Sequence, residues 1–410
     1  MSLAEYEAAG GCQALRKAIR MSPKEVQQIV LDSGLRGRGG AGFPTGRKWS
    51  SIPMEGRHQR KYLVVNADEM EPGTMKDRFL MEGDPHQLVE GIAIACYAVG
   101  ADTAFIFLRW EYELCERRLA KAIADARAKG YLGPNILGSG FNLDIRIHVS
   151  AGRYMCGEEA GMLDALEGRR AIPRSKPPHP TTCGLWGKPT LINNVETICC
   201  VPHIVLGGPR WYRGLGLSGE GGTKIYGCSG RVRRPGLWEL PMGTPAREIL
   251  FEHAGGMLDG YAFRAMLPGG ASTGFMLDEH LDVPMDFDSV EKVGSRLGTG
   301  TMIVMDDRTC PVGMQLSMQR FFARESCGWC TPCREGLAWV AGTLAALEAG
   351  QGESGDMEIL DFHARILKPG HTFCALAPGA AMPLAGAMKY FRDDFQRHID
   401  RRCCPWSSVQ

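Results

Sequence analysis

The sequence predicts an α/β protein of three parts: a region with a parallel sheet, a small α+β domain and a C-terminal four-helix bundle. Strand-like and helix-like patterns alternate between residues 61 and 168, which is typical of βαβ units. Short strands with Gly/Pro turns fill residues 223–306, and only helical patterns follow residue 307. The length of 410 residues suits two or three domains.

In the first region we expect strands at 61–66, 104–108 and 143–149, and helices at 23–32, 85–99, 111–129 and 157–166. This order implies parallel strands whose carboxyl ends bind ligands. The apolar stretch 91–108 carries Asp102, so it predicts a helix followed by a strand and not a membrane span.

The later regions are predicted to contain one helix at 246–254 and bundle helices at 312–323, 332–347, 357–367 and 380–395. Residues 173–180 are rich in proline and predict a loop, and residues 350–355 predict a connection between helices.

Charge and cysteine content limit the function classes. The formal net charge is +1, which argues against a non-specific nucleic-acid binder or a polybasic membrane anchor. Residues 1–20 lack the pattern of an export signal, so we expect a cytosolic protein in a reducing compartment. The fifteen cysteines are therefore candidates for metal binding and not for disulfides.

The strongest motif is ESCGWCTPCREG at residues 325–336, which spaces Cys327, Cys330 and Cys333 as Cys-x2-Cys-x2-Cys. Three thiolates at this spacing on a curling loop can each bind one iron of a cubane cluster. Zinc fits less well, because its sites usually pair ligands from two separate knuckles. The alternative is three unrelated buried cysteines.

The fourth iron needs a ligand from elsewhere in the chain. Cys374, in the motif HTFC, lies between two predicted bundle helices and is the preferred candidate. Cys403 and Cys404 compete for this role, but we expect them in a frayed C-terminal tail.

A second motif is the glycine-rich segment LRGRGGAGFPTGRKW at residues 35–49. Gly37, Gly39 and Gly42 satisfy GxGxxG, but a predicted helix and not a strand precedes them, so an ordinary dinucleotide fingerprint is not indicated. Glycines interleaved with basic residues favour an anionic ligand pressed onto bare backbone. A flexible surface loop is the alternative.

Three further motifs follow predicted strands or open predicted helices. NADEMEPG, at residues 66–73, places three acidic residues after the first strand. These carboxylates could form a metal site, lie in a solvated turn, or accept hydrogen bonds from a ribose or a ring N–H, and the sequence leaves all three open. AGRYMCGEE, at residues 151–159, is expected to open a helix at Gly157, whose free N–H groups would receive polar ligand atoms. NNVET, at residues 193–197, offers two adjacent amides to a ligand, and an ordinary turn or helix cap is the alternative.

Together with RSKPP, these motifs resemble the NADH-binding flavoprotein subunit of bacterial respiratory complex I, the proton-pumping NADH:quinone oxidoreductase, from about residue 33 to residue 395. The resemblance implies a Rossmann-like FMN domain with the N-terminal segment at 1–214, a ubiquitin-like (SLBB-type) domain at 215–306 and a four-helix bundle with one [4Fe–4S] cluster at 307–410. The implied reaction is hydride transfer from NADH to FMN, followed by transfer of single electrons through the cluster toward quinone.

The resemblance also implies roles for individual residues. The glycine-rich loop would line the FMN and NADH pocket with Gly37, Arg38, Gly39, Gly40, Gly42 and Lys48. The remaining flavin contacts would come from Asn66, Asp68, Glu69, Tyr154, Gly157, Glu158, Asn193, Asn194 and Thr197. NADH would face Phe43, Glu71, Glu159 and Lys176, and the two glutamates would repel the 2′-phosphate of NADPH. The cluster ligands would be Cys327, Cys330, Cys333 and Cys374.

Three positions depart from the family pattern. His179 stands where a phenylalanine is usual, Ser51 where an apolar residue is usual and Ala160 where a threonine is usual. The implied partners are the other peripheral-arm subunits, especially a thioredoxin-like [2Fe–2S] subunit and a large iron–sulfur subunit, at the cytoplasmic face of the inner membrane without direct insertion. The alternatives are a diaphorase subunit of an NAD-linked hydrogenase or formate dehydrogenase, and a non-catalytic iron–sulfur scaffold.

Overall fold

The structure, a computed structural model, describes residues 1–54 and 60–406. They form two compact units. The first unit contains Met1–Met70, Met75–Lys224 and Leu240–Gly243, and the second contains Glu71–Thr74, Ile225–Glu239 and the chain from Thr244 onward.

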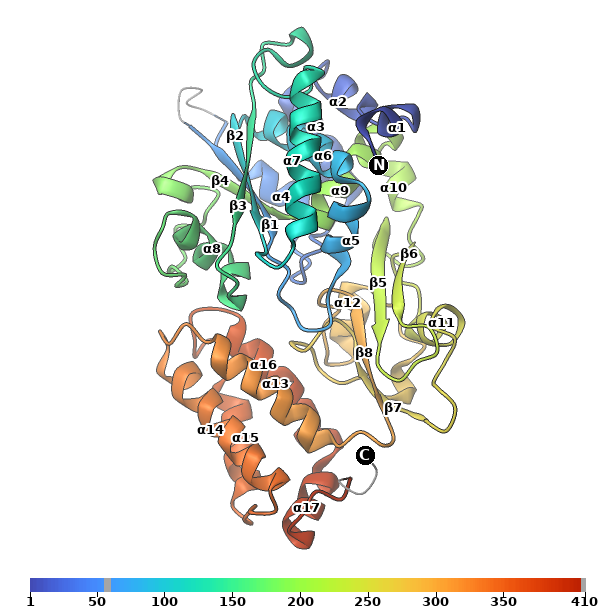
Figure 1. The fold of residues 1–410 in the computed structure, drawn as a ribbon, viewed down its shortest axis with the longest axis vertical. Helices are drawn as coiled ribbons and strands as arrows, with labels where there is room; N and C mark the ends of the chain where they lie inside the picture. The colour runs from blue at the N-terminus through green and yellow to red at the C-terminus, as the bar shows by residue number, and fades with distance from the viewer. Residues whose placement is uncertain (55–59, 407–410) are drawn as a thin grey trace. The chain divides into compact units, whose positions relative to one another are not determined.

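The first unit contains a four-stranded parallel sheet in the order β3-β2-β1-β4 (Figure 1). Its strands are β1 (Tyr62–Ala67), β2 (Thr103–Leu108), β3 (Asp144–Val149) and β4 (Thr190–Asn194). The three strands expected between residues 61 and 149 are confirmed, and β4 was not predicted. Asn66 pairs in register with Asn194, so the carboxyl ends of β1 and β4 lie side by side.

The expected helices of this unit are also present. The helices are α1 (Leu3–Ala8), α2 (Gln13–Ala18), α3 (Pro23–Ser33), α4 (Thr45–Ser50), α5 (Lys76–Gly83), α6 (Pro85–Val99), α7 (Glu113–Ala128), α8 (Glu159–Leu166), α9 (Val195–Gly207) and α10 (Pro209–Arg213), with short 3-10 turns at Ile136–Gly138, Tyr154–Gly157 and Leu185–Gly187. Helix α6 begins at the predicted residue because Asp84 caps it, its side chain accepting from the backbone N–H of Gln87, and it ends at Gly100, which has a φ of 71°.

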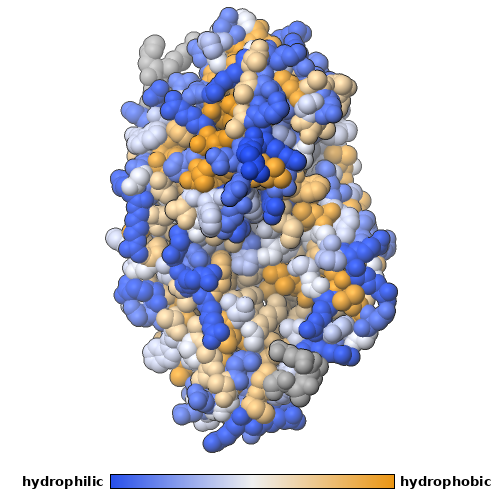
Figure 2. Space-filling view, viewed as in Figure 1, coloured by the Kyte–Doolittle hydropathy of each residue, from blue (hydrophilic) through white to orange (hydrophobic). Residues whose placement is uncertain are grey.

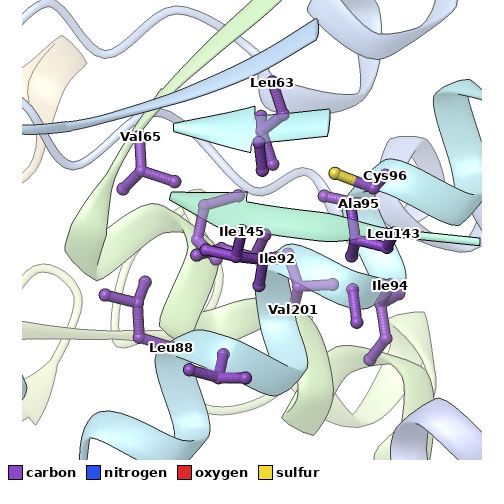
Figure 3. Close-up of a cluster of buried hydrophobic side chains, with 14 of the residues drawn as sticks. Leu63, Val65, Leu88, Ile92, Ile94, Ala95, Cys96, Leu143, Ile145 and Val201 are labelled. Atoms are coloured by element: carbon purple, nitrogen blue, oxygen red, sulfur yellow. The ribbon is translucent and has the colours of Figure 1, made fainter. Parts of the chain in front are cut away.

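Side chains alternate between the two faces of this sheet and are buried on both. Leu63 and Val65 of β1 and Ile145 of β3 point toward Leu88 and Ile92 of α6 on one face (Figure 3). The intervening residues Tyr62 and Val64, with Phe105 and Phe107 of β2, pack against α8 on the other face. A parallel sheet covered on both faces is the layout that the alternating pattern predicts.

One boundary differs from the sequence prediction. The helix expected to open at Gly157 starts at Glu159, because Gly157 ends a 3-10 turn and Glu158 is extended, with φ −74° and ψ 134°. Glu158 is the N-cap of α8, and its carboxylate accepts hydrogen bonds from the backbone N–H groups of Ala160 and Gly161. The N–H groups of Ala160 and Gly161 therefore bind the chain's own carboxylate.

The second unit contains a mixed sheet in the order β6-β5-β8-β7. Its strands are β5 (Thr223–Ser229), β6 (Gly236–Pro241), β7 (Phe263–Leu267) and β8 (Thr301–Asp306). β5 and β8 are parallel, and β7 and β8 are antiparallel. The predicted helix at 246–254 is present as α11 (Ala246–Glu248) and a π-helical turn (Ile249–His253), and α12 (Phe287–Lys292) and a 3-10 turn (Asp278–His280) follow.

The C-terminal part of this unit is helical, as predicted. It contains α13 (Pro311–Glu325), α14 (Thr331–Glu348), α15 (Asp356–Ile366), α16 (Leu376–Tyr390) and α17 (Arg392–Arg401). The single helix expected at 380–395 is wrong, because the chain breaks at Phe391, where φ is −124° and ψ is 22°. The break separates α16 from α17.

Within residues 1–54 and 60–406, no helix is both long and apolar enough to cross a bilayer. Hydrophilic and hydrophobic residues are interspersed over the face that Figure 2 shows. The apolar stretch at 91–108 divides between α6 and β2, as its Asp102 predicted.

Candidate functional site

The glycine-rich loop closes on itself before α4. The backbone N–H of Gly37 donates to the carbonyl of Phe43 at 2.9 Å, and the N–H of Thr45 donates to the carbonyl of Leu35 at 2.8 Å. Gly40 has a φ of 120°, a conformation that favours glycine. The loop is therefore a closed turn that exposes bare backbone.

A second predicted motif, NNVET, meets this loop. The backbone N–H of Arg38 donates to Thr197 Oγ1 at 2.8 Å, which joins the loop to the first turn of α9. A Cβ atom added to Gly39 would lie 3.1 Å from the Cβ of Asn194, so glycine allows the loop to approach β4 closely. Trp49 Nε1 donates to Asn193 Oδ1 at 2.9 Å and joins α4 to the same strand end.

The guanidinium of Arg38 points away from the exposed backbone of the loop. It is buried and donates to Tyr212 Oη at 3.0 Å and to the carbonyl of Thr223 at 3.0 Å. Arg36 likewise bonds within the chain, to the carbonyl of Gly42 and to Glu220. The guanidinium groups of Arg36 and Arg38 therefore both bond within the chain.

The acidic motif lies at the carboxyl end of β1, as predicted. Asn66 Nδ2 donates to the carbonyl of Gly157 at 2.9 Å, which joins β1 to the segment before α8. Asp68 is buried and accepts from Ser150 Oγ at 2.7 Å, so the end of β3 also contributes. Four predicted motifs thus converge at one edge of the sheet.

Glu69 is buried and caps the N-terminus of α5. Its carboxylate accepts from the backbone N–H groups of Asp77 and Arg78, at 3.0 and 3.1 Å, and from Tyr112 Oη at 3.1 Å. Burial raises the pKa of Glu69 to about 7, and the nearby carboxylate of Asp77 also raises it. Glu69 thus changes charge near neutral pH.

Behind these residues lies a buried charge network that the sequence did not predict. Asp77 accepts from Asn194 Nδ2 at 2.6 Å and pairs with Lys76 at 2.7 Å. Lys76 and Lys224 both pair with Glu196, each at 3.0 Å. Burial lowers the pKa of Lys224 to about 8 despite Glu196. Lys224 is distant in sequence from the predicted motifs and belongs to none of them, whereas Lys76 and Asp77 lie shortly after the acidic motif.

A second charged group surrounds the start of α8. Lys176 Nζ lies 3.3 Å from Glu158 Oε1 and 3.3 Å from Glu159 Oε2, and Lys48 also pairs with Glu159. Burial alone would raise the pKa of Glu159, but Lys48 and Lys176 outweigh it and hold the pKa below its ordinary value. The carboxylates of Glu158 and Glu159 therefore form one cluster with the ammonium groups of Lys48 and Lys176, and all four residues were predicted for the site.

The other predicted residues of this site are placed as follows. Phe43 is 56% exposed. Tyr154 opens the 3-10 turn before α8, and His179 is exposed in the loop at 173–180. Glu71 belongs to the second unit, where its carboxylate accepts from the backbone N–H of Ser272 at 2.7 Å.

The cysteine motif lies between α13 and α14, with Cys330 as the N-cap of α14. Burial raises the pKa of the Cys333 thiol, and the neighbouring Cys327 and Cys330 thiols raise it further. The backbone N–H of Phe373 donates to Cys330 Sγ at 3.4 Å, so the loop that carries Cys374 folds back onto the motif. Thiolates at the N-terminus of an 18-residue helix are favoured by its dipole.

The expectation that Cys404 lies in a frayed C-terminal tail is wrong. Its thiol is in hydrogen-bond contact with Cys310 and Glu348, and Trp406 stacks on His398 with ring centres 5.8 Å apart. This tail is held against α13, α14 and α17.

Comparison with known proteins identifies relatives of both units. Residues 30–203 match the family model of the Nuo51 FMN-binding domain, and residues 313–398 match that of the NADH-ubiquinone oxidoreductase-F iron-sulfur binding region. The chain is 54% identical to the F-type subunit of the NADH-quinone oxidoreductase of Salmonella typhimurium, over 97% of its length and 89% of the relative's. It is 53% identical to an F-type subunit of the NADH-quinone oxidoreductase of Rhizobium meliloti, over 98% of its length and 96% of the relative's.

Among solved structures, the chain is similar to an NAD+-reducing [NiFe]-hydrogenase in the H2-reduced state. The TM-score is 0.82 and the identity 34%, over 95% of this chain and 64% of the hydrogenase chain. The chain therefore spans less than two thirds of that hydrogenase chain.

Proposed function

The chain belongs to the family of F-type subunits of NADH-quinone oxidoreductase, and on this premise we propose how its residues bind FMN, NADH and an iron–sulfur cluster. It is an NADH dehydrogenase flavoprotein subunit of complex I. When bound, FMN would supply a hydride acceptor for NADH that can release electrons singly, and the [4Fe–4S] cluster would supply one-electron transfer toward partner subunits and quinone.

One observation carries the assignment of the flavin site. Four motifs from distant parts of the chain meet at the carboxyl ends of β1 and β4, joined by the bonds Arg38–Thr197 and Asn66–Gly157. Ligands of open α/β sheets bind at this edge. The residues fit FMN, because the loop offers exposed backbone at Gly39 and partly exposed backbone at Gly37 and Gly40 while buried polar groups surround the strand ends. Gly42 is buried and contributes to the closed shape of the loop.

The flavin site comprises the loop glycines, Lys48 and the polar residues at the strand ends. The latter are Asn66, Asp68, Glu69, Tyr154, Gly157, Glu158, Asn193, Asn194 and Thr197. Arg38 contributes its backbone, since its guanidinium is bonded to Tyr212 and Thr223. Glu69 caps α5 by accepting from the backbone N–H groups of Asp77 and Arg78, and so holds the start of this helix in place.

We propose that Phe43, Glu159 and Lys176 bind NADH. For Glu71, which belongs to the second unit, this role comes from the family resemblance. The exposed ring of Phe43 is suited to stacking on a base or nicotinamide, because aromatic rings bury a large area on contact. Glu159 is held ionised by Lys48 and Lys176, so it presents a negative charge that disfavours a 2′-phosphate. We therefore infer a preference for NADH over NADPH.

The cluster is bound by Cys327, Cys330, Cys333 and Cys374. This ligand set is supported by the proximity of the Phe373 N–H to Cys330 Sγ at 3.4 Å and by the nearby Cys327 and Cys330 thiols, which raise the pKa of Cys333. Four thiolates match the four irons of a cubane. The motif lies within the residues matched by the iron-sulfur family model.

For the domain organisation we propose a Rossmann-like FMN domain at 1–214, a ubiquitin-like domain at 215–306 and a bundle at 307–410. The mixed sheet β6-β5-β8-β7 with α11 supports the second domain, and the helices from α13 onward support the third. The bundle helices are α13, α14, α15 and α16, with α17 as an addition.

Within complex I we propose contacts with a thioredoxin-like [2Fe–2S] subunit and a large iron–sulfur subunit, at the cytoplasmic face of the inner membrane. A diaphorase subunit of a hydrogenase is the second candidate, which the similarity to the [NiFe]-hydrogenase structure favours. The higher identity to the F-type subunits of NADH-quinone oxidoreductase, over most of their length, argues for complex I.

The visible spectrum of the purified chain tests this function. We expect the absorption of an oxidised flavin over a broad iron–sulfur background, and anaerobic NADH should bleach the flavin band. An iron–sulfur spectrum without flavin absorption after reconstitution with FMN, iron and sulfide would contradict the assignment and favour a non-catalytic iron–sulfur scaffold.

A further inference from the structure

Four metal-binding side chains that the proposed function does not use meet in the second unit. They are Cys310, the N-cap of α13; Glu348, the last residue of α14; His398, on α17; and Cys404, which follows α17. One ligand atom from each lies within 4.8 Å of all the others. Residues from three helices and the C-terminal tail thus converge on one point.

The contacts within this group are short. Cys310 Sγ lies 2.9 Å from Glu348 Oε1 and 3.4 Å from His398 Nε2, and His398 Nε2 lies 3.2 Å from Glu348 Oε1. In a tetrahedral zinc site with bonds of about 2.0–2.3 Å, ligand atoms are roughly 3.3–3.8 Å apart. Small side-chain rotations would therefore suffice to admit an ion.

His398 is oriented as a metal ligand. Its ring is buried, and Nδ1 lies 2.7 Å from the backbone carbonyl oxygen of Asp394. A carbonyl can only accept, so Nδ1 carries a proton, and Nε2 is the ring atom that faces Cys310 and Glu348. A backbone carbonyl on the far nitrogen is the usual support of a zinc-binding histidine.

The tail that carries Cys404 is held in place. Trp406 stacks on His398, and the guanidinium groups of Arg264 and Arg397 lie 5.7 and 5.3 Å from the centre of the Trp406 ring. Both arginines also pair with Asp394. Cys404 is thus positioned before any ion binds.

Without an ion, the group is a poor environment for thiolates. Burial raises the pKa of the Cys310 thiol far above its usual range, and the hydrogen bond to Glu348 raises it further. Burial also raises the pKa of Cys404. A divalent cation reverses this preference, because it displaces thiol protons when it binds.

We propose that Cys310, Glu348, His398 and Cys404 bind one Zn2+ ion in a closed structural site, separate from the iron–sulfur cluster. Two sulfurs, one nitrogen and one oxygen are a ligand set suited to Zn2+, and four protein ligands leave no position for a substrate. Binding releases the two thiol protons and crosslinks α13, α14, α17 and the tail. The site stabilises the helical region that carries the cluster motif.

Metal analysis of the full chain with FMN and cluster bound tests the proposal. We expect about one zinc per chain in addition to the cluster iron when the protein is produced with zinc in the medium. Cys310→Ser and His398→Gln should each lower the zinc retained after dialysis by about tenfold or more, with iron and FMN unchanged. Cys403→Ser is the matched control, because Cys403 is exposed and adjacent to Cys404, and it should retain the zinc.

A second measurement needs no variant and so does not depend on variants that fold. Co2+ added to the zinc-free holoprotein should give the thiolate charge-transfer and visible bands of a tetrahedral site, and Zn2+ should displace them. Trace zinc in a wild-type protein with full iron content, or equal zinc in wild type and His398→Gln, would overturn the proposal. A Cys310–Cys404 disulfide in the purified holoprotein would also overturn it.

Discussion

The backbone N–H of Arg38 donates a 2.8 Å hydrogen bond to Thr197 Oγ1 and joins two motifs that are 159 positions apart in the chain. The bond orients the glycine-rich loop over the carboxyl end of β4, where α9 begins. Because Arg38 is buried, an unpaired N–H there would cost roughly 1–3 kcal/mol. The shape of the flavin site therefore depends on this bond.

Replacing the acceptor should weaken FMN binding. In Thr197→Val the N–H of Arg38 loses its partner, and we expect the Kd for FMN to rise about tenfold, in line with a cost of roughly 1–3 kcal/mol. Thr45→Val is the matched control, because Thr45 Oγ1 is buried on the same loop and has no hydrogen-bond partner among the described residues. Fluorescence titration of the apoprotein with FMN checks both variants, and equal affinities would refute the role of the bond.

The raised pKa of Glu69 makes the stability of the apoprotein depend on pH. Burial raises this pKa from 4.5 to about 7, so Glu69 contributes stability that is full below 4.5 and is lost as the pH rises through about 7. Glu69→Gln removes this dependence. It also loses an acceptor of the Asp77 and Arg78 N–H groups, but that loss does not vary with pH.

We therefore expect the Tm of Glu69→Gln, relative to wild type, to rise steadily between pH 5 and pH 8. Thermal unfolding of both proteins in one buffer series measures it. A constant difference between the two Tm values over that range would show that Glu69 does not titrate there.

The charge of Glu159 should govern the choice between NADH and NADPH. Glu159→Gln leaves Lys48 and Lys176 with less opposing charge, so a 2′-phosphate becomes less unfavourable. We expect the ratio of kcat/KM for NADPH to that for NADH to rise roughly three- to tenfold. Glu167→Gln, at the other end of α8, is the control and should leave the ratio unchanged. A wild-type enzyme that uses both nucleotides equally well would contradict the proposed specificity.

His179 is exposed where the family usually carries phenylalanine, and we expect it to stack on the adenine of NADH. His179→Phe should then lower the KM for NADH about fivefold, since a stacking contact is worth roughly 1 kcal/mol. His179→Ala should raise the KM. If neither substitution alters the KM, the position does not contact the nucleotide.

Local patterns predicted most of the fold, and long-range contacts account for what they missed. The limits of α6 follow from Asp84 and Gly100, which act within one turn of the chain. The burial of the Arg38 guanidinium depends on Tyr212 and Thr223, far along the sequence, so no local pattern could predict it. Lys224 lies on β5 without a motif, and only the fold brings it to Glu196.

The cysteines show the same division. The spacing of Cys327, Cys330 and Cys333 is local, and the sequence singled it out at once. The group of Cys310, Glu348, His398 and Cys404 draws on three helices and the tail, and the spacing of these residues in the sequence carries no signal. The expected fraying of the tail was wrong because Trp406 packs on His398, a contact that composition does not reveal.

The central claim is that hydride transfer and onward electron transfer occur at two separate cofactors. Removing a cluster ligand should then spare the first step and stop the second. Cys374→Ala removes the thiol next to Phe373, whose N–H bonds to Cys330, and leaves the flavin motifs untouched. Cys183→Ala, an exposed cysteine outside the cluster motif, is the matched control.

The most direct measurement is the NADH:ferricyanide reductase activity of Cys374→Ala, expressed per bound FMN. Ferricyanide can accept electrons at the flavin, so we expect the variant to retain wild-type activity per FMN, while quinone reduction by the complex assembled with its partners is lost. Loss of ferricyanide reduction in a variant that retains its FMN would contradict the account.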